Sequence, residues 1–116
     1  MKSKHSVTVG DVFFAELPNT GGRVINGRRP VVIVSNRTRS TVSVLPVTTT
    51  PQKNALSTHV KLGPECGLER PSTALAEQLL CLDIAQLRRF VSHLPRNKMQ
   101  EIRSAIFSNL GLPSTA

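Results

Sequence analysis

The chain has 116 residues, which suits one domain with a modest core and excludes a two-domain enzyme. Its 15 Lys and Arg against 7 Asp and Glu give a formal net charge of +8, which implies an anionic partner: nucleic acid, an acidic protein or an anionic membrane surface. Hydrophobic residues make up 39% of the chain, with neither Trp nor Tyr, so Val, Leu and Ile must build a globular core.

The cysteines and the N-terminus indicate the compartment. Cys66 and Cys81 lie far apart in the sequence, which argues against a disulfide framework and against a structural zinc site. No segment approaches the roughly 20 apolar residues that cross a bilayer. Residues 1–5 are basic, but no apolar region follows them to complete a signal peptide. We therefore expect a cytoplasmic protein with no membrane partner.

A strand and a loop are predicted at the start of the chain. Residues 8–17 contain β-branched and aromatic side chains, which predicts a strand with its adjacent Phe13 and Phe14 on opposite faces. Residues 19–28 contain glycines and arginines with little periodicity, which predicts a mobile basic loop.

A hairpin is predicted next. Residues 30–35 are an unbroken β-branched run, and residues 41–47 form a second run after a polar turn. Pro46 predicts an edge strand or a bulge at its position, because proline cannot donate to a ladder. Residues 58–62 alternate as a half-buried strand does.

The second half of the chain is less regular. Residues 72–82 are ambiguous, because their propensities favour helix while their length suits a strand. Asp83 could cap a short helical turn through Arg89. Apolar residues then recur at helical spacing, which predicts a C-terminal amphipathic helix: Met99, Ile102, Ile106 and Leu110. About five strands and one helix indicate a compact β barrel or roll with a helix packed on it.

Common catalytic motifs are missing from the sequence. It has no phosphate-binding glycine loop, no His-Glu-x-x-His and no acidic cluster for two metal ions, so a metal-dependent nuclease is disfavoured. His5, His59 and His93 are scattered, and we interpret each as a surface residue.

The densest chemical signal is an arginine pair before Pro30 and a threonine run at residues 48–50. A guanidinium can direct two donors at a phosphate, and hydroxyls can add hydrogen bonds. Such a site needs no metal on RNA, because the ribose 2′-hydroxyl is a nucleophile already beside its phosphate. Physical chemistry alone favours the alternative, in which Arg28 and Arg29 are solvated charges and the threonines are merely good β formers.

Four segments, in their order and spacing, resemble the MazF/PemK family of toxin endoribonucleases: residues 10–15, 27–35, 44–49 and 76–78. The resemblance runs from about Val9 to Leu112 and implies a single domain over residues 1–116 with flexible termini. The implied fold is mainly β (α+β), an SH3-like barrel of the CcdB/PemK type with a C-terminal α-helix. The implied activity is cleavage of single-stranded RNA at a short recognition sequence, without metal or cofactor.

The same resemblance implies the partners and the catalytic pair. It implies a homodimer and an acidic, MazE-like antitoxin whose C-terminal segment occupies the substrate groove. The family's catalytic arginine and threonine correspond to Arg29 and Thr48. Arg29 would stabilise the phosphorane and pass a proton to the leaving 5′-oxygen, and Thr48 would hold the phosphate. The implied products carry 2′,3′-cyclic phosphate and 5′-hydroxyl ends. A guanidinium is a poor general base, so the proton acceptor is not identified.

Further RNA-binding residues are expected around this pair. Arg28 and Thr49 are its sequence neighbours. Glu77 and Gln78 match the family's acidic residue and glutamine, and this match favours a strand for residues 72–82. Gln78 could read a base edge. Glu77 is either an acceptor at the site or an ordinary carboxylate on the strand surface.

The loop of residues 22–28 departs from the family. Many members have Gly-Ser-Glu-Gln where this chain has Gly-Arg-Val-Ile, so the recognised bases are not implied. Arg23 is either a contact to the RNA backbone or a solvated loop residue. Phe13 or Phe14 and stacked arginines must replace the missing Trp and Tyr as platforms for bases.

Two rival functions remain at this point. One is a non-catalytic toxin of the CcdB type, which poisons DNA gyrase through its C-terminal helix. The retained Arg29 and Thr48 argue against it. The other is a nucleic-acid-binding barrel without activity. For the helix, we expect Met99, Ile102 and Ile106 to close the domain's own core rather than a dimer interface.

Overall fold

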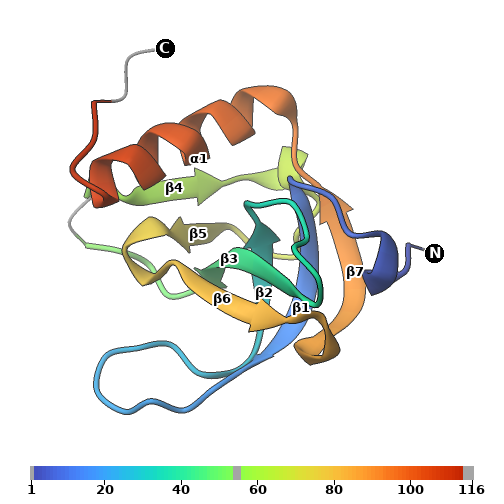
Figure 1. Ribbon diagram of the computed structural model, residues 1–116. Helices are drawn as coiled ribbons and strands as arrows, with labels where there is room; N and C mark the ends of the chain where they lie inside the picture. Colours follow the sequence, from blue (N-terminus) through green and yellow to red (C-terminus); the bar gives the residue numbers. More distant parts are fainter. Residues whose placement is uncertain (1, 54–55, 114–116) are drawn as a thin grey trace.

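The computed structural model describes residues 2–53 and 56–113, in which a bent antiparallel sheet carries one α-helix (Figure 1). The strand order is β4-β5-β3-β2-β1-β7, and β6 also pairs with β3. The strands are β1 (Asp11–Leu17), β2 (Gly27–Ile33), β3 (Thr41–Thr48), β4 (His59–Leu62), β5 (Ser72–Leu75), β6 (Leu80–Asp83) and β7 (Leu87–His93). The helix is α1 (Arg96–Asn109), and short 3-10 turns are η1 (Lys4–Ser6), η2 (Pro64–Cys66), η3 (Ala76–Gln78) and η4 (Ile84–Gln86). The expected mainly β fold with a C-terminal helix is confirmed.

Strand β3 is the centre of the sheet and changes partner along one edge. Residues 41–44 pair with β6, whereas residues 47 and 48 pair with β5. Pro46 lies between these two partners and opposite Val31 of β2. The missing N–H of proline therefore costs no ladder hydrogen bond there. The predicted β2–β3 hairpin is confirmed, but β3 is a central strand rather than an edge strand, and Pro46 marks the change of partner.

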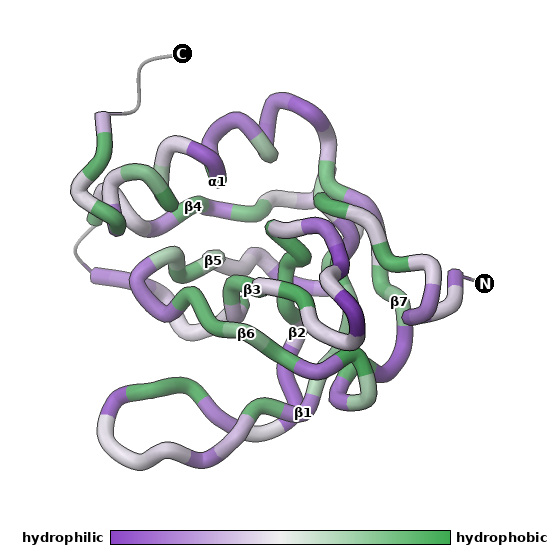
Figure 2. Tube along the Cα trace, in the orientation of Figure 1, coloured by the Kyte–Doolittle hydropathy of each residue, from purple (hydrophilic) through white to green (hydrophobic). Residues whose placement is uncertain are grey.

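Alternation along the strands builds two buried clusters. The helix-side core includes Val12, Val32 and Leu45, and Ile102 of α1 closes it. The loop-side core lies on the other face of β1 and β2 and contains the side chains of Phe13, Ala15, Val31, Ile33, Val42 and Val44. Figure 2 shows the hydrophobic residues concentrated in the middle of the sheet around β2 and β3. Burial of such apolar surface is the main force that holds the fold together.

Residues 72–82 do not form one strand. They form β5, the 3-10 turn η3 and β6, so Glu77 and Gln78 lie on a turn between two strands. The turn is closed by hydrogen bonds from the main-chain nitrogen of Ala76 to Thr58 and from that of Leu79 to Ala76. The prediction of a continuous strand was wrong. The turn divides the segment into β5 and β6, which pair with opposite ends of β3.

The segment after Asp83 is partly as expected. Asp83 caps η4 with a capping box, in which its carboxylate accepts from the main-chain nitrogen of Ala85 at 2.8 Å. The turn ends at Gln86, and residues 87–93 form β7 instead of continuing to Arg89. Pairing with β1 creates this strand, and Phe90 of β7 lies opposite Phe13.

Helix α1 confirms the predicted amphipathic helix. Ile102 is buried, and Met99 and Ile106 pack against the helix-side core, so these three residues close the domain's own core as expected. Leu110 is 54% exposed and does not join the core. Gly111, with φ of 70°, follows the last turn. No helix in the described ranges is long and apolar enough to cross a membrane.

Candidate active site

Arg29 in β2 and Thr48 in β3 project from the same face of the sheet. The β2–β3 ladder ends at Val31 opposite Pro46, and Arg29 and Thr48 each lie two residues beyond this pair, just past the end of the ladder. Directly opposed side chains of an antiparallel pair share a face. Alternation assigns both residues to the face of the loop-side core, beyond its last apolar side chains. The two sequence candidates therefore emerge together at one end of the sheet.

The Arg29 side chain is half-buried and held at one atom. Its Nε donates a hydrogen bond to the main-chain oxygen of Asn26 at 3.2 Å. In the described part of the chain, its terminal nitrogens have no hydrogen-bond or ion-pair partner. This leaves the forked end of the guanidinium free for the oxygens of a phosphate.

Thr48 is 5% exposed, and its hydroxyl is also oriented. The Oγ1 atom accepts a hydrogen bond from the main-chain nitrogen of Thr50 at 3.1 Å. Because the oxygen accepts this bond, the hydroxyl proton remains available to an anionic oxygen. The backbone of Thr48 pairs with Thr73 in β5, which anchors it at the end of the strand. Its neighbour Thr49 is exposed.

Gln78 binds the loop between β1 and β2 rather than projecting freely. Its Oε1 accepts from the main-chain nitrogen of Ile25 at 2.8 Å, and its Nε2 donates to the main-chain oxygen of Arg23 at 3.4 Å. The loop, residues 18–26, extends from the body of the sheet (Figure 1) and ends at the carbonyl that holds Arg29. Gln78 of η3 therefore holds the loop whose Asn26 carbonyl accepts the hydrogen bond from Arg29.

Glu77 lies beside Gln78 but is engaged by a histidine. Its Oε2 lies 2.9 Å from Nε2 of His59. Burial would raise the pKa of Glu77, but hydrogen bonds from its own main chain and from His59 outweigh burial and lower the pKa. The side chain of His59 is only 9% exposed, so its interpretation as a surface residue was wrong. Because an ionised carboxylate can only accept, Nε2 of His59 donates in this contact, and the buried Nδ1 has no partner among the described residues.

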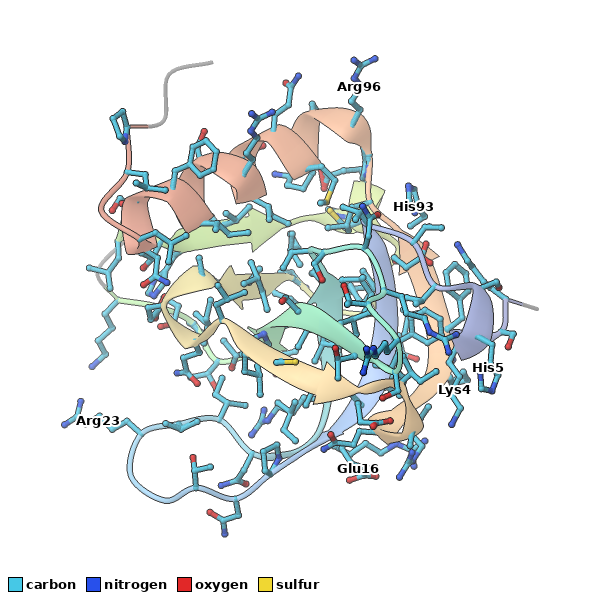
Figure 3. All side chains as sticks on the ribbon, viewed as in Figure 1. Lys4, His5, Glu16, Arg23, His93 and Arg96 are labelled. Carbon is cyan, nitrogen blue, oxygen red and sulfur yellow. The ribbon has the colours of Figure 1, made fainter. Side chains whose placement is uncertain are left out.

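Arg23 and Arg28 lie apart from the Arg29 and Thr48 pair. Arg23 projects from the tip of the loop away from the molecule (Figure 3). Arg28 precedes Arg29 in β2, so its side chain extends from the opposite face, where it approaches the ring of Phe14. The expected RNA-binding residues therefore do not form one cluster. Phe13 is fully buried and cannot stack on a base, which leaves Phe14 as the outward ring.

Arg89 is a candidate that the sequence reasoning did not identify. Its guanidinium carbon lies 4.9 Å from the centroid of the Phe14 ring, and that of Arg28 lies 6.0 Å from the same centroid. The sequence offered one usable signal, an outward phenylalanine in a chain rich in arginine. Without the β1–β7 pairing, however, nothing placed Arg89 beside it.

The fold and the site by themselves define a class: a small antiparallel domain with a C-terminal helix and an arginine and a threonine at neighbouring strand ends. A family model described as PemK-like, MazF-like toxin of type II toxin-antitoxin system matches residues 8–110. The chain belongs to this family.

Individual relatives agree with this membership. The chain is 36% identical over 108 residues to an endoribonuclease MazF of Staphylococcus saprophyticus, covering 89% of this chain and 90% of that protein. Among solved structures, it is similar to an endoribonuclease in complex with its cognate antitoxin from a mycobacterial species, with a TM-score of 0.73, 25% identity and coverage of 93% and 96%. It also shares the fold of MazF from Deinococcus radiodurans, with a TM-score of 0.76, 23% identity and coverage of 90% and 96%.

Proposed function

We propose that this protein is the endoribonuclease toxin of a type II toxin-antitoxin pair and that it cleaves single-stranded RNA at Arg29 and Thr48. The observation that carries the proposal is the geometry of this pair. Both side chains project from one face. The terminal nitrogens of Arg29 have no partner among the described residues, and the Thr48 hydroxyl can still donate its proton in a hydrogen bond. Family membership and the net charge of +8 support an RNA substrate.

The proposed reaction is an internal transesterification. The 2′-hydroxyl gives its proton to water, the 2′-oxygen bonds to the adjacent phosphorus, and the bond from phosphorus to the 5′-oxygen breaks as that oxygen takes a proton from Arg29, which regains one from water. Arg29 and Thr48 stabilise the negative charge that grows on the phosphorus oxygens, which is the usual role of preorganised donors. The products carry a 2′,3′-cyclic phosphate and a 5′-hydroxyl. The tethered nucleophile makes this route possible without a metal ion.

Two partner proposals accompany this activity. An acidic antitoxin suits the basic surface. A homodimer, which the family resemblance implies, would cover apolar side chains that one copy leaves exposed, such as Val9 and Leu110. Action on cellular RNA would place the protein in the cytoplasm.

The decisive experiment is a digest of mixed RNA by the purified protein in excess chelator, with fragment ends identified by mass spectrometry. We expect 2′,3′-cyclic phosphate and 5′-hydroxyl ends, which disappear with Arg29→Ala. Sequencing the 5′-ends of the fragments then gives the recognition sequence.

The alternatives give different results in the same assay. RNA that stays intact but is retarded on a gel would indicate a nucleic-acid-binding domain without activity. Intact RNA together with inhibition of DNA gyrase would indicate a toxin of the CcdB type. Either result would overturn the proposed function.

A further inference from the structure

A second cluster of arginines lies on the opposite face of the sheet from Arg29. Phe14 of β1 is half-buried, and the guanidinium carbons of Arg89 and Arg28 lie 4.9 Å and 6.0 Å from its ring centroid. These three residues come from the adjacent strands β1, β7 and β2. Cation–π contacts of this kind hold a guanidinium in place while its N–H donors stay available. We call this set the Phe14 platform.

The Phe14 platform borders a concavity of about 340 Å³. Its lining includes Phe14, Pro30, Thr49, Arg70, Ser72 and Arg89. Pro30 and Thr49 are the residues that directly follow Arg29 and Thr48 in the sequence. The concavity thus lies at the same strand ends as the proposed catalytic pair, on the opposite face of the sheet.

The electrostatics of this concavity favour an anion. Arg70 and Arg89 line the concavity and Arg28 lies near its Phe14 wall, and none of the three forms an ion pair within the part of the chain that the structure describes. Glu69 also lines the concavity, but it makes no salt bridge to any described residue. Bringing like charges together costs free energy unless an opposite charge joins them, so an oxyanion is the ligand that relieves this repulsion.

We propose that the Phe14 platform binds a second backbone phosphate of the RNA, on the opposite face of the sheet from the phosphate that is cleaved. This proposal rests on the proposed function, because the RNA is the polyanion expected at Arg29. Arg28 and Arg29 are consecutive and project to opposite faces, so an RNA strand crossing the start of β2 meets one site after the other. This continuity favours RNA over an acidic peptide. The guanidiniums of Arg28 and Arg89 lie against the Phe14 ring, where a base would otherwise stack. We therefore expect the platform to bind a phosphate rather than a base.

The test is the salt dependence of binding to a non-cleavable 2′-O-methyl RNA oligonucleotide. For single strands, the slope of log affinity against log salt falls in magnitude by about 0.7 for each phosphate that the protein no longer neutralises. We expect a change of about 0.7 for Arg89→Gln, with weaker binding at low salt. Phe14→Leu keeps both charges but removes the ring, so we expect binding to weaken about two- to fivefold.

Arg103→Gln is the matched control. Its guanidinium carbon lies 5.3 Å from the ring centroid of Phe107 on α1, so this variant also removes one positive charge from an arginine stacked on a phenylalanine. We expect its slope to equal that of the unmodified protein. Thermal unfolding of each variant shows whether it folds, and Arg89 and Arg103 are both exposed residues.

The outcomes separate this inference from the proposed function. Equal slopes for Arg89→Gln and Arg103→Gln would overturn the platform, even if the unmodified protein cleaves ordinary RNA. Failure of the unmodified protein to cleave RNA, with the expected slope change, would overturn the proposed function and leave the platform as an RNA-binding site. If Arg89→Gln weakens only the binding of an acidic antitoxin peptide, the platform is a peptide site and the inference is wrong.

Discussion

Arg29 and Asn26 are joined by a hydrogen bond of 3.2 Å from the guanidinium Nε to the main-chain oxygen, so the loop before β2 orients the proposed catalytic arginine. Gln78 holds the same loop through the main chain of Ile25 and Arg23. A residue on η3 therefore influences Arg29 without touching it. This arrangement makes Gln78 a positioning residue in the proposed reaction.

Gln78→Leu is expected to slow RNA cleavage by about 10- to 100-fold, because small misplacements of a catalytic group are costly. Gln78→Glu keeps an acceptor for the Ile25 nitrogen but loses the donor to the Arg23 oxygen, so we expect an intermediate rate. Single-turnover cleavage of a defined RNA measures both. A residue that reads a base would instead change the preferred cleavage sequence, whereas loss of positioning slows all sites alike. Gln78→Leu cleaving as fast as the unmodified protein would contradict this role.

Thr48→Val removes the hydroxyl from a side chain of nearly the same shape. We expect cleavage to fall about 10²- to 10³-fold, the usual effect of removing one donor from an anionic transition state. Stability should fall by only about 1 kcal/mol, because the Thr50 main-chain nitrogen loses its acceptor. Thr48→Ser keeps the hydroxyl and serves as the control, and it should retain most of the activity. Equal activities of the two variants in the same digest would exclude the hydroxyl from the reaction.

Asp11 is expected to make stability depend on acidic pH. The residue is 1% exposed, and its carboxylate lies 2.7 Å from Nζ of Lys2, 2.8 Å from Nδ1 of His93 and 2.9 Å from the main-chain nitrogen of Thr8. Burial would raise the pKa of Asp11, but hydrogen bonds from Lys2, His93 and Thr8 outweigh burial and lower it from 3.8. Because the pKa of Asp11 is lower in the folded protein than in the unfolded chain, its contribution to stability is fully present above the unfolded-state pKa. That contribution is lost as the pH falls through the folded-state pKa.

Asp11→Asn should therefore cost about 1–3 kcal/mol near neutral pH, because the partly exposed Lys2 and His93 lose their carboxylate partner but remain accessible to water. It should also flatten the loss of stability below a pH near 3.8. Urea unfolding at a series of pH values measures both effects. Lys2→Met separates the two side-chain contacts of Asp11, because it leaves the His93 contact in place. A variant with the same acid slope as the unmodified protein would show that another group controls acid unfolding.

Local patterns predicted those parts of the fold that local physics determines. Helical spacing placed the helix that α1 confirms, and the β-branched runs located the β2–β3 hairpin. β7 was missed because its basic residues resemble a solvated segment until β1 lies beside it. Gln78 was identified as a site residue, but its contact with Ile25 spans 53 positions and is visible only in the fold. Arg89 escaped notice for the same reason, since its partner Phe14 is distant in the sequence.

Gly67 lines the concavity of the Phe14 platform, and substituting it tests how rigid the turn at this position is. Its φ is +75°, and an added Cβ would lie 2.7 Å from Cβ of Ser92, whose hydroxyl donates a hydrogen bond of 2.6 Å to the Cys66 carbonyl. The neighbouring Arg70 lines the concavity of the Phe14 platform. Gly67→Ala therefore combines backbone strain with overpacking, and we expect a loss of about 2–4 kcal/mol.

Gly21→Ala is the matched control for Gly67→Ala. Its φ is +83°, but nothing lies within 4 Å of an added Cβ, so only the backbone strain remains. We expect a loss of about 1 kcal/mol or less, because the exposed loop can relax. Thermal or urea unfolding compares the two variants directly. If both lose the same stability, the close approach of Ser92 does not constrain this turn, and the wall that carries Arg70 is free to move.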